Sequence, residues 1–330
     1  MKFGTLAVTD AEGAILAHSI RHGGGVIKKG TRLDASAIAA LTDSGVSEVI
    51  CARLDADDVH EDEAAYRLAC QLACPTIRVD DAFTGRANLF ATEAGVLVPQ
   101  GVAIDAANRV DEAITVATLD ALKPVVPGEM VGTVKIIPFA VPDRAVAAAS
   151  EALGASALSV APFRAKRIGV VATMLPTLKP SVMDKTRRIL DGRLEGTGSG
   201  VIDERRVAHD PDAVAKAIAD LQAQRADLIL VYGASAIVDR KDVVPDGIER
   251  AGGVIRHFGM PVDPGNLMLM AEIDDVPVIG APGCARSPKE NGFDWVLQRL
   301  LADIDVTPED VQAMGVGGLL RDARRAAAAG

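Results

Sequence analysis

Residues 228–248 read LILVYGASAIVDRKDVVPDGI, so an apolar run of strand length ends in a turn of small residues and then a charged loop. Two carboxylates in that loop, Asp239 and Asp242, are oxygen ligands of the kind that a hard divalent cation prefers. The turn before them allows a ligand to approach the backbone closely, and it consists of Gly233, Ala234 and Ser235. The pattern predicts a metal-assisted site at Asp239 and Asp242. The alternative is that Asp242 only caps the helix that follows.

Several common catalytic patterns are absent from this stretch and from the rest of the sequence. The turn has no Gly-Lys-Ser/Thr ending and no G-x-G-x-x-G spacing, which argues against the common route of nucleotide hydrolysis and against NAD chemistry. His60 is the one histidine among carboxylates, and a solvated helix start explains that setting. The other histidines show neither triad nor metal spacing: His18, His22, His209 and His257. A hydrolase therefore has little support.

A second candidate site, for an anion, lies in GAPGCARSPKENGFDW. The turn at Pro282 and Gly283 lets the backbone approach a ligand. Arg286, Ser287 and the start of the next helix supply hydrogen-bond donors that suit a phosphate. An ordinary strand-to-helix turn is the alternative.

A third loop, GMPVDPGN, combines two prolines with two turn residues. Pro261 and Pro264 fix φ, while Gly265 and Asn266 tolerate unusual backbone angles or supply turn hydrogen bonds. Taken alone, this loop is mainly structural.

All three loops follow predicted strands in a region where strands and helices alternate. From residue 166 onward, the strands are RIGVVATM, ADLILVYG, GVIRHFGM, NLMLMAEI and VPVIGAPG. The main helices are SVMDKTRRILDGRL, HDPDAVAKAIADLQAQ (with Asp210 as N-cap and Pro211 at its first position) and ENGFDWVLQRLLAD. This alternation predicts an α/β fold, a three-layer α/β/α domain with a mostly parallel sheet, over residues 166–305. In such sheets, ligands bind outside the carboxyl ends of the strands.

The first half of the chain lacks this alternation of strands and helices, and its sequence predicts a mixed α+β, β-rich region. Residues 1–55 read as a small mixed α/β segment with a helix starting near Asp34. Residues 56–165 read as a β-rich module with helices at HEDEAAYRLACQLA and at 108–119, NRVDEAITVATL. Residues 306–330 form a C-terminal extension, whose end, RDARRAAAAG, reads as a frayed helix or a linker.

Composition limits the function further. The 330 residues carry a net charge of −10, which argues against nucleic-acid and anionic-membrane partners. The N-terminus lacks a secretory apolar region, and no uncharged apolar run approaches the ~20 residues that span a bilayer. The cysteines form no C-x-x-C pair, and we expect Cys70 and Cys74 to be buried thiols on one helix face. The sequence thus predicts a cytoplasmic protein.

Several of these segments together resemble a known family. The segments that show the resemblance are RIGVVATM, LILVYGASAIVDRKDVVPDGI, GMPVDPGNLMLMA and VPVIGAPGCARSP. In this order, residues 166–303 resemble the molybdopterin-binding domain shared by molybdopterin adenylyltransferases and molybdopterin molybdenumtransferases. ILAHSIRHGGGVIKKGTRLDASAIAALTDSGVSEVIC is similar to a segment of molybdenumtransferase-like proteins. VHEDEAA and DVTPEDVQAMGVGGL resemble a subgroup of molybdopterin-binding proteins.

The resemblance implies a ligand and roles for the residues above. The ligand would be molybdopterin or the molybdenum cofactor, with transfer of adenylate or molybdate, and with Mg²⁺ and ATP or AMP as further ligands. Asp239 and Asp242 would be catalytic and lie near the metal or the incoming oxyanion, and Arg286 would hold the terminal phosphate. The implied cofactor-binding residues are Thr173, Gly233, Ala234, Ser235, Pro264, Gly265, Asn266, Pro282, Gly283, Cys284, Arg286 and Ser287. Related proteins also imply a homodimer, and a client molybdoenzyme or a nucleotidyltransferase as partner.

The sequence departs from the family at places that matter for catalysis. Ala234 replaces one of two paired glycines, Tyr232 replaces a threonine, and Val244 stands where threonine is usual. VATMLPTLKPSVMDKT replaces a Ser/Thr-Gly-Asx-Glu turn, so an acidic group expected near the metal-insertion site is missing. A non-catalytic carrier or scaffold that has lost the transferase reaction remains an alternative, as does an unrelated sugar-phosphate or nucleotide enzyme.

Overall fold

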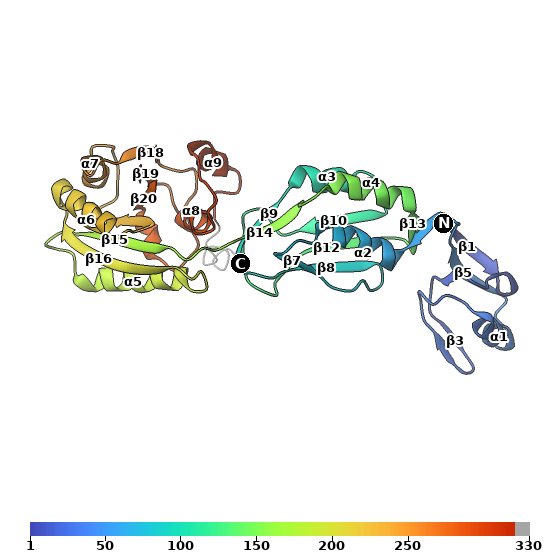
Figure 1. The fold of residues 1–330 in the computed structure, drawn as a ribbon. Helices are drawn as coiled ribbons and strands as arrows, with labels where there is room; N and C mark the ends of the chain where they lie inside the picture. The colour runs from blue at the N-terminus through green and yellow to red at the C-terminus, as the bar shows by residue number, and fades with distance from the viewer. Residues whose placement is uncertain (321–330) are drawn as a thin grey trace. The chain divides into compact units, whose positions relative to one another are not determined.

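The computed structural model describes residues 1–320, and the chain divides into two compact units, Met1–Val160 and a second that begins at Ala161 (Figure 1). Each unit has its own buried core. The helix or linker predicted at the very end of the chain, from residue 321, lies outside the described residues. No helix within the described residues is long and apolar enough to cross a membrane.

The first unit starts with a small antiparallel sheet in the order β1 (Lys2–Ala7), β5 (Glu48–Arg53), β2 (Ile15–Leu16). One helix, α1 (Ala35–Asp43), packs with it, and β3 (Ile20–His22) and β4 (Gly25–Ile27) form a hairpin. The predicted cap is confirmed, because the Asp34 carboxylate accepts a hydrogen bond of 2.8 Å from the Ala37 N–H. Leu16, Leu33 and Leu41 belong to the core of this segment.

The rest of the first unit is rich in β structure, as predicted. Its largest sheet has the order β10 (Ile114–Thr118), β12 (Met130–Ile136), β8 (Arg86–Ala91), β7 (Ile77–Val79). A three-stranded sheet has the order β11 (Pro124–Val125), β9 (Gly95–Pro99), β14 (Leu158–Pro162). A two-stranded sheet pairs β13 (Ala140–Pro142) with β6 (Asp58–His60). The helices are α2 (Glu61–Leu72), α3 (Gly101–Asn108) and α4 (Asp143–Leu153). These helices and sheets share one apolar cluster.

Two sequence predictions in this unit are wrong. The helix expected over 108–119 is absent: α3 ends at Asn108, and Ile114–Thr118 is strand β10. Ile114 and Val116 alternate inward with period 2, and pairing with β12 satisfies the backbone, so the β-branched residues decide the local structure. Cys70 is exposed, and Cys74 lies beyond the end of α2.

The second unit contains a six-stranded sheet in the order β16 (Gly200–Ala208), β15 (Arg167–Met174), β17 (Leu228–Tyr232), β20 (Val276–Ala281), β19 (Leu269–Ile273), β18 (Val254–Phe258). The first four strands are parallel, and β19 and β18 are antiparallel to their neighbours. The mostly parallel sheet is therefore confirmed.

Helices cover both faces of this sheet (Figure 1). Successive residues of β17 alternate between two cores: Leu230 packs with α5 (Pro180–Leu194) and α8 (Gly292–Leu301), and Val231 packs with α6 (Pro211–Ala223) and α7 (Val243–Arg250). The short α9 (Pro308–Gln312) joins the first of these cores. Asp210 caps α6 and Pro211 is its first residue, as predicted.

Candidate functional site

The carboxyl ends of the four parallel strands meet at one edge of the sheet. In the register, Ala172 of β15 lies opposite Tyr232 of β17, and Tyr232 lies opposite Ala281 of β20. The turn that begins at Gly233 and the turn that begins at Pro282 therefore leave the sheet at the same edge. The predicted residue Thr173 is the next residue of β15, so it lies there too.

Thr173 connects this edge to the turn after β17. It is fully buried, and its hydroxyl accepts a hydrogen bond of 2.6 Å from the Ala234 N–H. The same hydroxyl lies 2.9 Å from Nδ1 of His209, and Nε2 of His209 lies 3.1 Å from the Ser235 hydroxyl. Three of the predicted residues are thus connected: Ala234 binds Thr173 directly, and Ser235 is joined to Thr173 through His209, for which no role was predicted.

The turns after β17 and β20 are joined by Arg286. Its guanidinium donates a hydrogen bond to the backbone carbonyl of Gly233. Arg286 is half-buried, and this burial lowers the pKa of its guanidinium. Gly233 is required by packing, because a Cβ there would lie 2.7 Å from the carbonyl oxygen of Ser235.

The two predicted metal ligands lie in one turn and bind its backbone. Asp239 is exposed, and its carboxylate accepts a 2.8 Å hydrogen bond from the Lys241 N–H. The carboxylate of Asp242 accepts hydrogen bonds from the Val243 N–H at 2.8 Å and the Val238 N–H at 3.2 Å, so it caps α7. Residues 1–320 contain no group of three or more His, Cys, Asp or Glu side chains that could hold a metal. Any metal here would need oxygen atoms from a ligand as well.

The turn after β20 forms a short 3-10 helix, η2 (Gly283–Arg286), with Pro282 at its N-cap. Arg193 of α5 donates to the carbonyl oxygens of Ala285 at 2.9 Å and Ser287 at 2.7 Å. The same guanidinium forms an ion pair with Asp294 of α8, and both side chains are about 10% exposed. A buried pair therefore fixes the backbone of the predicted anion turn.

Asn291 also binds this turn. The amide of Asn291 donates to the carbonyl of Lys289 at 3.0 Å and to that of Cys284 at 3.4 Å. Cys284 itself is partly buried, and this burial raises the pKa of its thiol. The carbonyl groups of the turn are thus held inward by Arg193 and Asn291.

The loop with Pro264, Gly265 and Asn266 lies at the same edge, because β19 begins opposite Gly280 near the end of β20. The Pro264 carbonyl accepts a 2.9 Å hydrogen bond from the Gly292 N–H at the start of α8. Gly265 has φ +145°, and a Cβ there would lie 2.9 Å from the Gly292 nitrogen. The Asn266 amide bonds the Met260 carbonyl at 3.4 Å. This loop therefore contacts the first residue of α8, the helix that follows the anion turn.

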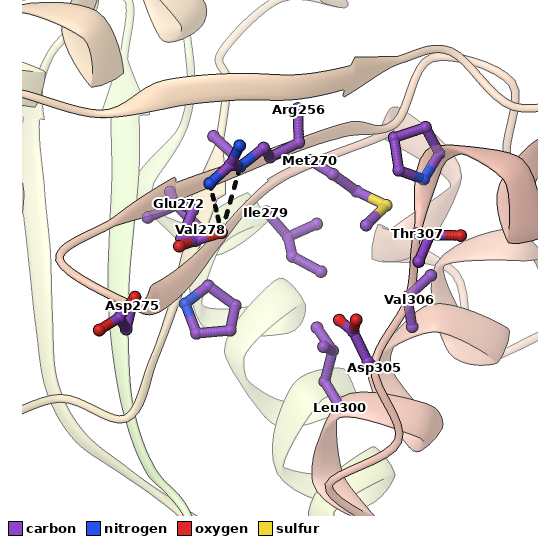
Figure 2. Close-up of a pocket in the computed structure, with 13 residues that line it drawn as sticks. Arg256, Met270, Glu272, Asp275, Val278, Ile279, Leu300, Asp305, Val306 and Thr307 are labelled. Atoms are coloured by element: carbon purple, nitrogen blue, oxygen red, sulfur yellow. Dashed lines mark hydrogen bonds and ion pairs between the residues drawn. The ribbon is translucent and has the colours of Figure 1, made fainter.

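A cavity of about 430 Å³ lies elsewhere in the second unit (Figure 2). It extends from the first half of β20 to the α8–α9 connection, and Val278, Leu300 and Thr307 line it. An ion pair of 3.2 Å between Arg256 and Glu272 crosses its rim. None of the predicted site residues lines this cavity.

Comparison with known families gives a match for the segment that contains these residues. Residues 170–303 match the family model described as a probable molybdopterin binding domain. The resemblance of this segment to molybdopterin-binding domains is therefore confirmed. The segment contains every predicted site residue, from Thr173 to Ser287, and also Arg193 and His209. A second model, described only as a domain of unknown function, matches residues 5–53. No curated protein matches the sequence.

Solved structures are also similar to this chain. The molybdopterin biosynthesis MoeA protein of Pyrococcus horikosii is 13% identical, with 92% of this chain and 75% of that chain covered and a TM-score of 0.31. The molybdopterin biosynthesis enzyme MoaB of Thermus thermophilus is 17% identical over 42% of this chain and 97% of its own, with a TM-score of 0.30. A MogA structure is 22% identical over 43% of this chain and 100% of its own, also with a TM-score of 0.30.

The sequence did not predict two residues that bind the turns of this sheet edge, His209 and Arg193. His209 follows β16, a strand of mixed charged residues whose burial is only partial, so no apolar run signals it. Arg193 lies near the end of an amphipathic helix, and its partner Asp294 is 101 positions away. The sequence spacing could have predicted a capping box between Asn291 and Asp294. It could not have predicted the ion pair between Asp294 and Arg193.

Proposed function

We propose that this protein binds molybdopterin or the finished molybdenum cofactor at the carboxyl edge of its parallel sheet, and that it acts in molybdenum cofactor biosynthesis or molybdoenzyme maturation. One observation carries the proposal. Within the segment that matches the molybdopterin-binding domain, Thr173, Ser235 and Arg286 come from three separate segments and are linked by hydrogen bonds at a single sheet edge.

The groups at this edge suit a phosphate-bearing ligand. Ser235 is exposed and offers a hydroxyl. Arg286 uses its guanidinium for one hydrogen bond, to Gly233, within the described part of the chain. A guanidinium has five N–H donors, so Arg286 can also donate to a phosphate oxygen beside that turn. The terminal phosphate would lie between Ser235 and the 282–287 turn.

Transfer of adenylate or molybdate would place further demands on Asp239 and Asp242. Mg²⁺ is usually held by one or two carboxylates together with substrate phosphates, and two aspartates in one turn fit that need. In this proposal a bound Mg²⁺ would neutralise charge on the phosphates, while Asp239 and Asp242 position it. A carrier that only binds the cofactor would not need the metal.

Calorimetric titration tests this proposal. Molybdopterin and its adenylylated form are titrated, with and without Mg²⁺, into the wild type, Asp242→Ala and Asp242→Asn. The Asn variant is the matched control, because its side-chain oxygen still caps α7 while the charge is gone. Binding that both variants weaken only in the presence of Mg²⁺ supports a metal-assisted transferase. Binding indifferent to metal and mutation supports a carrier. Absence of binding to either ligand refutes the proposed function.

Assembly and partners belong to the same proposal. We expect a cytoplasmic homodimer that delivers its ligand to a client molybdoenzyme or works with a nucleotidyltransferase. Light scattering at micromolar concentration checks the first part, and a monomeric mass contradicts it.

A further inference from the structure

A hydrogen-bonded chain at the sheet edge connects a buried threonine to an exposed serine through His209. Thr173 Oγ1 lies 2.9 Å from His209 Nδ1, and His209 Nε2 lies 3.1 Å from Ser235 Oγ. Thr173 is fully buried, His209 is partly buried and Ser235 is exposed. Both ring nitrogens thus face hydroxyl groups, and the direction of each hydrogen bond depends on where the ring carries its proton.

The contacts of Thr173 decide that direction. Its hydroxyl oxygen already accepts the Ala234 N–H at 2.6 Å, so its single proton has two possible acceptors. The Tyr232 carbonyl is 3.5 Å away and the His209 Nδ1 is 2.9 Å away. Of the two acceptors, Nδ1 lies within the usual distance of a hydroxyl hydrogen bond and the Tyr232 carbonyl does not, so the distances favour donation from Thr173 to Nδ1.

With Nδ1 as the acceptor, the donor on the His209 ring is Nε2. This N–H donates to Ser235 Oγ, so Ser235 accepts from the histidine and its own proton points away from the ring. The exposed hydroxyl is left as a donor beside the turn that Arg286 contacts through Gly233. A hydroxyl that donates, next to a cationic guanidinium, suits an oxyanion. The opposite tautomer would make Ser235 a hydroxyl that donates to a base, as in a nucleophile.

We infer that His209 is a positioning residue of the ligand site, which orients the Ser235 hydroxyl so that it donates a hydrogen bond to a phosphate oxygen of the ligand. This inference rests on the proposed function for the identity of the ligand, molybdopterin. It adds a residue and a hydrogen-bond direction that the family match does not assign. Ser235 contacts the ligand directly, while His209 acts through Ser235.

The tautomer can be measured in the free protein. Long-range ¹H–¹⁵N spectra of the imidazole rings distinguish a proton on Nε2 from one on Nδ1, and the spectrum of His209→Gln assigns the His209 signals by their loss. We expect the Nε2–H form. An Nδ1–H form, or labelling of Ser235 by a fluorophosphonate, would overturn the inference, because Ser235 would then behave as an activated nucleophile.

Binding of molybdopterin and of inorganic phosphate is compared across a set of variants. Ser235→Ala is expected to weaken binding roughly tenfold, as for loss of one hydrogen bond to a charged group. His209→Asn keeps an amide near Nδ1 but does not reach Ser235, so it should weaken binding similarly. His209→Gln places an amide near Nε2 and should recover most of that loss. Ser199→Ala, which removes a hydrogen-bonded serine at the opposite edge of the sheet, is the control.

Two results separate this inference from the proposed function. The double variant Ser235→Ala/His209→Asn should bind no more weakly than Ser235→Ala alone, because His209 acts only through that hydroxyl. Additive losses would overturn the inference. A wild type that binds phosphate but not molybdopterin, with the same dependence on His209, would refute the proposed function and keep the inference. A wild type that binds neither would refute both.

Discussion

The turns that leave β17 and β20 share one edge of the sheet but are held in different ways. The turn after β20 has its carbonyl groups bound by Arg193 and Asn291, and an ion pair between Arg193 and Asp294 lies beneath it. The second half of the turn after β17 is mostly exposed, and within residues 1–320 its aspartates bind neighbouring backbone N–H groups. Distant segments fix the turn after β20 and also the first half of the turn after β17, whereas the second half of the turn after β17 is held by local hydrogen bonds.

Because they are held differently, the two turns should differ in how easily they change shape. A turn fixed by buried contacts keeps its shape without a ligand, so under the proposed function it would present a phosphate site that is already formed. A segment held by local hydrogen bonds opens at lower free energy, so under the same proposal it would adjust to the ligand or release it. The predictions below test whether the two turns differ in this way.

The largest effect is expected for Arg193→Ala. Removing the guanidinium leaves Asp294 as a buried charge without its partner and frees the carbonyls of Ala285 and Ser287. We expect a loss of about 3–5 kcal/mol in the free energy of unfolding, measured by denaturant titration. Arg188→Ala on the same helix removes an exposed side chain, which donates a 3.4 Å hydrogen bond to the Asp184 carbonyl, and should cost less than about 1 kcal/mol. Equal losses in the two variants would show that the β20 turn is not specially held.

The chemical reactivity of Cys284 probes the same turn. Burial raises the pKa of its thiol, so less of the reactive thiolate is present at a given pH, and access is restricted as well. At pH 8 we expect iodoacetamide to modify Cys284 roughly tenfold more slowly than the exposed Cys70, followed by peptide mass spectrometry. Arg193→Ala should raise the rate at Cys284. Equal rates at the two cysteines in the wild type would mean that the turn opens readily.

The sequence predicts the location of this site better than its construction. Apolar runs that end in glycine or proline mark the carboxyl ends of β17 and β20, and the rule for parallel sheets brings them together. The edge strand β16 was missed because its charged residues alternate with partly buried ones and form no apolar run. His209 reaches Thr173 only because Ala208 pairs with Met174, and such a register is not readable from local pattern. The assignments of individual site residues remain predictions.

A moderate effect is expected in the second half of the turn after β17, which is held by local hydrogen bonds. Asp242→Ala removes the cap of α7 and should cost about 1 kcal/mol in the free energy of unfolding, whereas Asp242→Asn should cost only a few tenths. Hydrogen exchange would show whether the loss is confined to α7, which is the expected result for a segment held by local hydrogen bonds. A loss of protection that spreads to η2 would contradict the contrast between the two turns.

The smallest change in the free energy of unfolding is expected for Tyr232, the last residue of β17. Its ring packs against that of Phe293 in α8. Its side chain is fully buried, and within residues 1–320 its hydroxyl has no hydrogen-bond partner. A buried hydroxyl without a partner costs free energy, so Tyr232→Phe should keep the ring packing and raise the free energy of unfolding by up to about 1 kcal/mol. Phe293→Leu, which removes the ring contact itself, should lower it. A clear loss of stability in Tyr232→Phe would mean that the hydroxyl contributes a hydrogen bond to the fixed turn. The turn after β20 would then depend on a residue of β17 as well as on Arg193 of α5 and Asp294 of α8.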